Sequence, residues 1–169
     1  SVLDAIGRKH TAQDIIDALE KVRSAGGMAV NMDLIAGLTS DTVAGFEETL
    51  RKVIALAPEN ITVHTLSLKK GSRITLEGSV LPTAAEVGRM LDIAGAALRE
   101  NGYSPYYLYR QKYMSGGFEN VGWTKDGYIN LYNVCIMEEL CSIIAVGGGS
   151  TKLVSAGSGR NIRLFAPKY

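Results

Sequence analysis

The strongest constraint on the fold is that three segments repeat apolar residues at helical spacing, each between helix start and stop signals. The first predicted helix begins at Thr11, with Asp14 three residues later in a capping-box pattern, and ends at Gly26. The other two run over about 46–57 and 83–98. Three separate amphipathic helices need another layer against which to bury their apolar stripes.

A short segment of strand composition follows each predicted helix, at 28–35, 61–68 and 103–113. Strands that alternate with amphipathic helices predict βα units and a parallel sheet, with ligands at the carboxyl ends of the strands. The alternation of predicted helices and strands then ends, because 115–130 is rich in Gly, Asn and Asp, a composition that predicts a long loop. Beyond it we expect a helix or turn near 131–140 and strands near 142–146 and 162–165 that extend the sheet.

The chain contains too few βα units to close an eight-stranded barrel of about 250 residues. It also opens almost directly into a helix, with no strand before it. The predicted fold class is therefore α/β, an incomplete (β/α) barrel with a β-rich C-terminal extension. We expect a single domain over 1–169, in which about 1–114 form the later half of the partial barrel and about 115–169 the extension.

Composition excludes several classes of protein. The chain is 46% hydrophobic and 21% charged, as in globular proteins, and its formal charge of +1 gives no basis for binding nucleic acid. No apolar run approaches the roughly 20 residues that span a bilayer, and the N-terminus lacks a signal-peptide pattern. The two cysteines, Cys135 and Cys141, are expected to be free thiols in the cytoplasm.

Asp33 is the most informative polar residue, because it lies in the apolar segment 28–35 near the carboxyl end of a predicted strand. Strand alternation places Asn31 and Asp33 on one face, away from Met32 and Leu34. A carboxylate in such a place needs a hydrogen-bonding partner or a ligand. A role in ligand binding and a structural role at the following turn both fit this position.

Other polar residues admit a functional and a structural interpretation. Arg8 has a guanidinium suited to carboxylates and planar groups, and it also fits a surface position. His64, within an apolar strand, is interpreted as a satisfied core histidine, and His10 as structural. With two histidines and no carboxylate paired with either, the sequence supports no transition-metal site and no acid–base pair.

Glycines and tyrosines mark two further segments. Gly147, Gly148 and Gly149 follow an apolar run, but Lys152 comes after Ser-Thr instead of before it, so the phosphate-loop pattern is not met. A tight turn or a close approach of backbone to ligand fits these glycines. The tyrosines of 103–113 partly alternate and could stack on a flat substrate or pack within the strand.

Four motifs occur in order along the chain: IGRKH at 6–10, NMDLIAGL at 31–38, YYLYRQK at 106–112 and NVGW at 120–123. The first two resemble the IGRxH…DLIxGLP run of oxygen-independent coproporphyrinogen III oxidases and their heme-chaperone relatives. The last two resemble the anaerobic bacterial branch called coproporphyrinogen dehydrogenase. The resemblance covers nearly the whole chain.

This resemblance implies a radical S-adenosylmethionine (SAM) oxidoreductase with a partial (β/α)₆ barrel and a [4Fe–4S] cluster held by a CxxxCxxC motif. Such enzymes convert coproporphyrinogen III to protoporphyrinogen IX by oxidative decarboxylation in anaerobic heme biosynthesis. On the family pattern, Arg8 and Asp33 contact SAM, and the backbone of Ser67 lies against it. The glycines at 147–149 resemble a late glycine turn beside the same pocket.

The chain departs from the family pattern in two ways. Thr39 stands where the family usually has Pro, and CxxxCxxC is absent. Because thiolates hold such clusters, we expect no cluster in this chain and no activity from it alone. Two alternatives remain open, a heme chaperone without oxidase activity and a small α/β binding domain, although the YYLYRQK and NVGW segments favour the oxidase.

The expected partner is a small porphyrinogen, with no nucleic acid and no membrane. If the barrel is incomplete, the segment 28–35 lacks a neighbour along one edge and carries no Lys, Arg or Pro to discourage pairing. We therefore expect a homo-oligomer, or the chain's own C-terminal tail folded over that edge.

Overall fold

The computed structural model describes residues 2–67, 80–110, 115–144, 151–154 and 161–164. They belong to two compact units, Ser1–Ile129 and Asn130–Tyr169. The boundary expected near 115 falls inside the first unit. The described elements of that unit are α1 (Val2–Ala5), α2 (Ala12–Ala25), β1 (Asn31–Ala36), α3 (Val43–Ala55), β2 (Asn60–Thr65), α5 (Ala84–Glu100), β3 (Ser104–Tyr109), a 3-10 turn (Ser115–Gly117) and β4 (Asn120–Thr124).

Local capping signals set the helix boundaries. Thr11 and Asp14 form a complete capping box, in which the Asp14 amide donates to Thr11 Oγ1 (3.2 Å) and the Thr11 amide to Asp14 Oδ2 (2.7 Å). Thr83 and Glu86 form the same motif at the start of α5. Thr42, as N-cap of α3, accepts from the amide of Gly45. The three predicted helices and the capping box predicted at Thr11 are confirmed. Capping contacts join residues close in sequence, so local spacing is enough to predict them.

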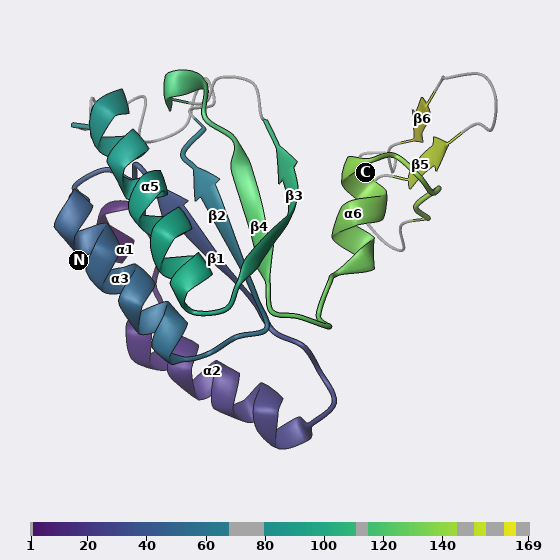
Figure 1. Ribbon diagram of the computed structural model, residues 1–169, viewed down its shortest axis with the longest axis horizontal. Coiled ribbons are helices and arrows are strands. Elements are labelled where there is room, and N and C mark those ends of the chain that lie inside the picture. Colours follow the sequence, from purple (N-terminus) through teal and green to yellow (C-terminus); the bar gives the residue numbers. More distant parts are fainter. Residues whose placement is uncertain (1, 68–79, 111–114, 145–150, 155–160, 165–169) are drawn as a thin grey trace. The chain divides into compact units, whose positions relative to one another are not determined.

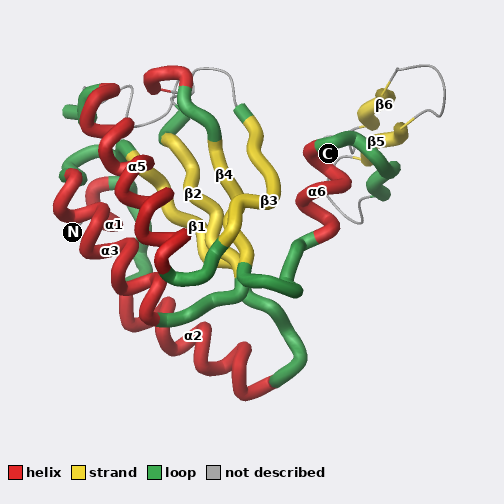
Figure 2. Tube along the Cα trace, viewed as in Figure 1, coloured by secondary structure: helices red, strands yellow, loops and turns green. Residues whose placement is uncertain are grey.

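The four strands form a mixed sheet in the order β1-β2-β4-β3 (Figure 2). β1 and β2 are parallel, as predicted for consecutive βα units, whereas β4 is antiparallel to both of its neighbours. The prediction of a loop over 115–130 is wrong where β4 forms. Its Val121 and Trp123 pair with Val63 and Ile61 of β2, and this pairing overrides a local composition typical of loops.

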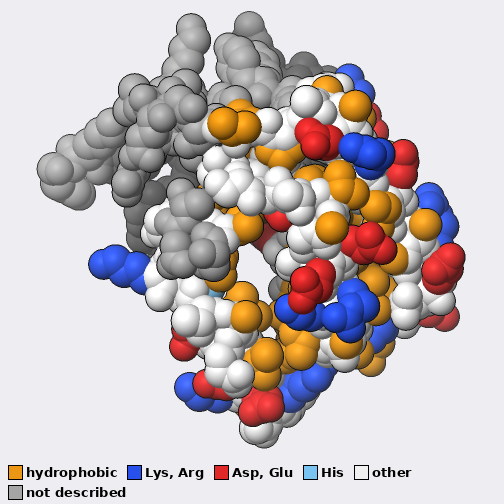
Figure 3. Space-filling view, turned by 90° about the vertical axis from the view of Figure 1, so that its left-hand side faces the viewer, with side chains coloured by type: hydrophobic (Ala, Val, Ile, Leu, Met, Phe, Trp, Pro, Cys, Tyr) orange, Lys and Arg blue, Asp and Glu red, His pale blue; other side chains and the backbone are white. Residues whose placement is uncertain are grey.

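Helices α3 and α5 pack side by side on one face of this sheet (Figure 1). The buried core between the layers consists of Leu34, Ala36, Phe46, Leu50, Ile61, Val63, Val87, Met90, Ala94, Leu98, Tyr103 and Trp123. On the view that turns the left-hand side of Figure 1 toward the reader, acidic and basic side chains are interspersed and do not gather by sign (Figure 3). The sheet therefore has one helix-covered face, and its strands present alternate residues on the other.

The second unit contains α6 (Leu131–Met137), β5 (Thr151–Val154) and β6 (Asn161–Leu164). The helix expected near 131–140 is confirmed. β5 and β6 pair with each other in a separate antiparallel sheet, so β6 does not extend the main sheet as predicted. Residues 142–144 are not a strand, and 145–146 lie outside the described residues.

Candidate functional site

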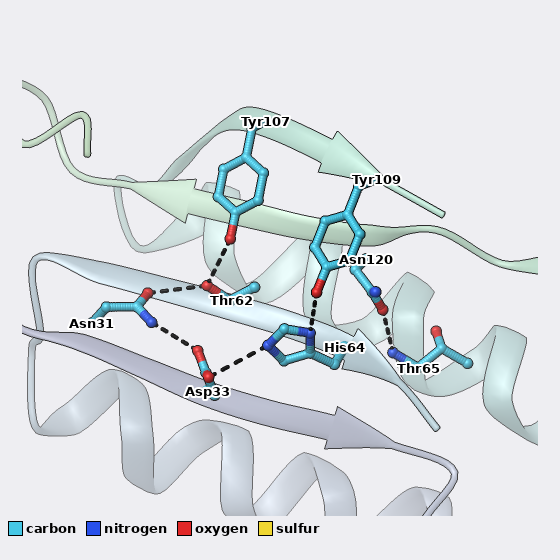
Figure 4. A network of polar contacts seen from close by, with 8 residues as sticks. All are labelled: Asn31, Asp33, Thr62, His64, Thr65, Tyr107, Tyr109 and Asn120. Atoms are coloured by element: carbon cyan, nitrogen blue, oxygen red, sulfur yellow. Dashed lines mark hydrogen bonds and ion pairs between the residues drawn. The ribbon is translucent and has the colours of Figure 1, made fainter. Parts of the chain in front are cut away.

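A group of polar side chains lies on the face of the sheet opposite to α3 and α5 (Figure 4). The register aligns Asp33 with Thr62, and Thr62 in turn with Gly122, so alternate residues of neighbouring strands share this face. We call this face the polar face. Its hydrogen-bonded side chains are Asn31 and Asp33 of β1, Thr62 and His64 of β2, and Tyr107 and Tyr109 of β3.

Asp33 lies at the centre of this group. Its Oδ1 accepts a hydrogen bond from Asn31 Nδ2 (2.7 Å), and its Oδ2 lies 3.5 Å from His64 Nε2. The hydrogen bond from His64 holds the pKa of Asp33 below its ordinary value, with a smaller contribution from Asn31, against the opposing effect of partial burial. The side chain is 60% exposed, so the ionised carboxylate remains accessible to a ligand.

His64 connects β1 to β3 through both of its ring nitrogens. Nε2 faces Asp33, and Nδ1 lies 3.1 Å from the hydroxyl oxygen of Tyr109. The side chain is 24% exposed, and its ring meets that of Tyr109 edge-on. Both ring nitrogens of His64 have partners, as predicted for a satisfied histidine, but the side chain lies on the polar face and not in the core. The statement that no carboxylate is paired with a histidine is wrong.

A second set of hydrogen bonds reaches Asp33 through Asn31. Thr62 Oγ1 donates to Asn31 Oδ1 (3.0 Å) and lies 3.3 Å from the Tyr107 hydroxyl. The Tyr107 ring stands over Gly122, where a Cβ would overlap it, so this position requires glycine. The rings of Tyr107 and Tyr109 are nearly parallel, at 4°, with centroids 6.2 Å apart. Three strands thus contribute to one hydrogen-bonded surface.

The predicted site residues are not all brought together. Asp33 lies on the face that alternation predicted, although β1 continues to Ala36, so Asp33 is inside the strand and not near its end. Ser67 lies two residues beyond the carboxyl end of β2 and is half-buried. Arg8 is exposed, and no hydrogen bond or ion pair within the described part of the chain joins it to Asp33. The glycines at 147–149 lie outside the described residues.

The roles of His64, Thr62 and Tyr109 on the polar face were not predicted from the sequence. A usable signal was present, because Thr62 and His64 alternate in β2 as Asn31 and Asp33 do in β1. If the two segments are paired as parallel strands with Asp33 opposite Thr62, His64 falls on the same face as Asp33 and beside it.

The chain is similar to known proteins along nearly its whole length. It is 41% identical over 169 residues to the oxygen-independent coproporphyrinogen-III oxidase-like protein HemZ of Bacillus subtilis, covering 98% of this chain and 34% of HemZ. It is 22% identical over 135 residues to the heme chaperone HemW of the same species, covering 75% of this chain and 35% of HemW. No family model matches.

Among solved structures, the chain matches the radical SAM enzyme coproporphyrinogen III oxidase (HemN) from Escherichia coli, with a TM-score of 0.60 and 20% identity. The match covers 85% of this chain and 30% of that one. The chain belongs to the family of oxygen-independent coproporphyrinogen III oxidases and their relatives. It spans about a third of the length of these relatives.

The family implies SAM and an iron–sulfur cluster, and the residues present fit the two differently. Asp33 Oδ1 accepts one hydrogen bond and Oδ2 lies 3.5 Å from His64 Nε2, so both oxygens keep capacity to accept, and the carboxylate suits an ammonium or hydroxyl group such as SAM carries. The whole chain holds two cysteines, too few for the cluster. Partial burial and the neighbouring Cys141 raise the pKa of Cys135, which disfavours the thiolate that binds metal.

Two further findings concern metals and membranes. Within the described residues, no three His, Cys, Asp or Glu side chains are grouped closely enough to hold a metal ion. No helix in the same part of the chain combines the length and hydropathy that crossing a bilayer requires.

Thr39, which replaces the family's usual proline, has a defined contact. It is buried, and its hydroxyl donates to the carbonyl of Val80 (3.1 Å). This contact ties the loop after β1 to the segment before α5.

Proposed function

We propose that this chain is part of a radical SAM oxidoreductase that converts coproporphyrinogen III to protoporphyrinogen IX by oxidative decarboxylation in anaerobic heme biosynthesis. The proposal is supported by the relationship to HemZ over 98% of the chain and by the fold shared with HemN. The observation that carries it is the accessible carboxylate of Asp33 on the polar face, at the position where the family motif predicts a SAM contact.

In this proposal the chain contributes binding and orientation. SAM, when bound beside a reduced cluster, supplies the radical, and the cysteines for that cluster come from outside these 169 residues. Asp33 accepts hydrogen bonds from SAM, and Arg8 and Ser67 are proposed as further contacts. The chain by itself is expected to be inactive.

The test is SAM binding by the full-length protein, measured by equilibrium dialysis without oxygen. Asp33→Ala should weaken binding by about 1.5–3 kcal/mol, because it removes a charge-assisted hydrogen bond. Asp92→Ala, which removes an exposed carboxylate from α5, is the matched control and should leave affinity unchanged. Unchanged SAM affinity in Asp33→Ala would refute the assignment.

A heme chaperone is the second candidate, and the match to HemW over 75% of the chain favours it. Conversion of coproporphyrinogen III by the reconstituted full-length protein separates the two candidates. Stoichiometric heme binding without conversion would favour the chaperone.

We also propose that the 169-residue chain self-associates through β1. β1 is an outer strand of the sheet, and Met28, which precedes it, is 58% exposed. Met28→Lys should shift sedimentation toward the monomer, whereas Val80→Lys, at an 85% exposed position elsewhere, should not. A wild-type chain that remains monomeric at high concentration contradicts this proposal.

A further inference from the structure

The hydrogen bonds of the polar face run in one direction and end on Asp33. Thr62 Oγ1 donates its single proton to Asn31 Oδ1, so the Tyr107 hydroxyl is the donor to Thr62. The Asn31 amide then donates to Asp33 Oδ1. On the other side, Tyr109, His64 and Asp33 Oδ2 form a second line of contacts. Both lines converge on one carboxylate.

The partners of His64 determine its tautomer. An ionised carboxylate can only accept, so Nε2 must carry the hydrogen that faces Asp33 Oδ2. In the neutral ring Nδ1 is then an acceptor, and the Tyr109 hydroxyl at 3.1 Å supplies the donor. The phenol of Tyr109 therefore selects the tautomer that can bond to Asp33.

These residues lie on strands and not on loops, which favours a fixed geometry. The parallel register aligns His64 with Ile35, two residues beyond Asp33 and on the same face. His64 is the less exposed of the pair, at 24% against 60% for Asp33. The imidazole thus forms a support, and the carboxylate is the group presented to a ligand.

We propose that His64 is a positioning residue, whose Nε2–H holds the Asp33 carboxylate in the orientation that accepts hydrogen bonds from SAM, while Tyr109 fixes the required tautomer. The inference rests on the proposed function, in which Asp33 contacts SAM. A carboxylate fixed before binding loses less conformational freedom when the ligand arrives. The hydrogen bond from His64 also keeps Asp33 ionised, in line with its lowered pKa.

The experiment compares three substitutions of His64 in the full-length protein, with SAM affinity measured anaerobically. His64→Gln places an amide N–H near the position of Nε2 and should bind SAM within about twofold of wild type. His64→Asn places its amide near Nδ1, short of Asp33, and His64→Leu has no donor. Both variants should weaken SAM binding about fivefold. This loss is smaller than the loss expected on removing a hydrogen bond to a buried charge, because the Asp33 side chain is 60% exposed. Circular dichroism of each variant checks that it is folded.

A double-mutant cycle separates positioning from a general structural role. In the Asp33→Ala background, His64→Leu should have no further effect on SAM affinity, because the group that it orients is gone. Equal losses in His64→Gln and His64→Leu, or a loss that persists in Asp33→Ala, would overturn the inference while leaving the SAM contact of Asp33 intact. If Asp33→Ala itself binds normally, the proposed contact fails and the inference fails with it.

Discussion

The two faces of the four-stranded sheet are built from alternate residues of the same strands, but they differ in chemistry. The face toward α3 and α5 carries Leu34, Val63 and Trp123 in a closed apolar core. The polar face carries Asp33 and His64, which are partly exposed, face each other at 3.5 Å, and have hydrogen bonds to Asn31 and Tyr109, respectively. Burial of apolar area stabilises the first face, whereas the second holds polar groups in place for a ligand. Stability and binding should therefore respond to different substitutions.

The largest expected effect comes from two adjacent residues on opposite faces. Leu34 is 7% exposed in the core, and Ile35 is 36% exposed on the polar face. Leu34→Ala should lower the free energy of unfolding by about 2–5 kcal/mol, because it leaves a cavity under the helices. Ile35→Ala, which removes the same number of carbons, should cost less than about 1 kcal/mol.

Urea unfolding followed by fluorescence of Trp123, the single tryptophan, measures both variants. Similar losses in the two variants would mean that the polar face is also packed against something in solution, and the contrast between the faces would be wrong.

Features set by residues close in sequence were predictable, and features set by strand pairing were not. Both capping boxes and the facing of Asn31 with Asp33 follow from local spacing. The contact of His64 with Asp33 joins residues 31 positions apart, and it depends on the register of β1 with β2. β4 needed the same kind of information, since Val121 and Trp123 are recognisable as strand residues only beside β2.

Gly122 offers an intermediate effect that is specific to the polar face. A methyl group there would overlap the Tyr107 ring, so Gly122→Ala should displace the ring, break its contact with Thr62 and cost about 1–3 kcal/mol. Gly95→Ala in α5 is the control, because its Cβ would approach Arg99 Nη1 at 3.2 Å and the ring of Trp123 at 3.9 Å without overlapping a ring as at Gly122. Alanine also favours the helix, so this control should be neutral or stabilising.

The overlap itself can be tested in a second background. With Tyr107→Ala already present, the added cost of Gly122→Ala should largely disappear. A cost that persists would place the requirement for glycine in the backbone and not in the ring above it.

The smallest expected effect on stability concerns Tyr103, on the core side of the sheet. Tyr103, 2% exposed in the core, donates to the carbonyl of Pro58 (2.6 Å). Burial, with a smaller contribution from the charge of Glu59, raises the pKa of Tyr103 to about 12, from an ordinary value of 10.0. The neutral phenol is thus favoured by the fold. The stability that this preference contributes to the folded state is complete below pH 10 and is lost as the pH rises toward 12.

Tyr103→Phe should lower the free energy of unfolding by about 0.5–1.5 kcal/mol at neutral pH and flatten this alkaline decline in stability. Unfolding free energies measured across this pH range compare the variant with wild type, and an unchanged decline in Tyr103→Phe would assign it to a different group.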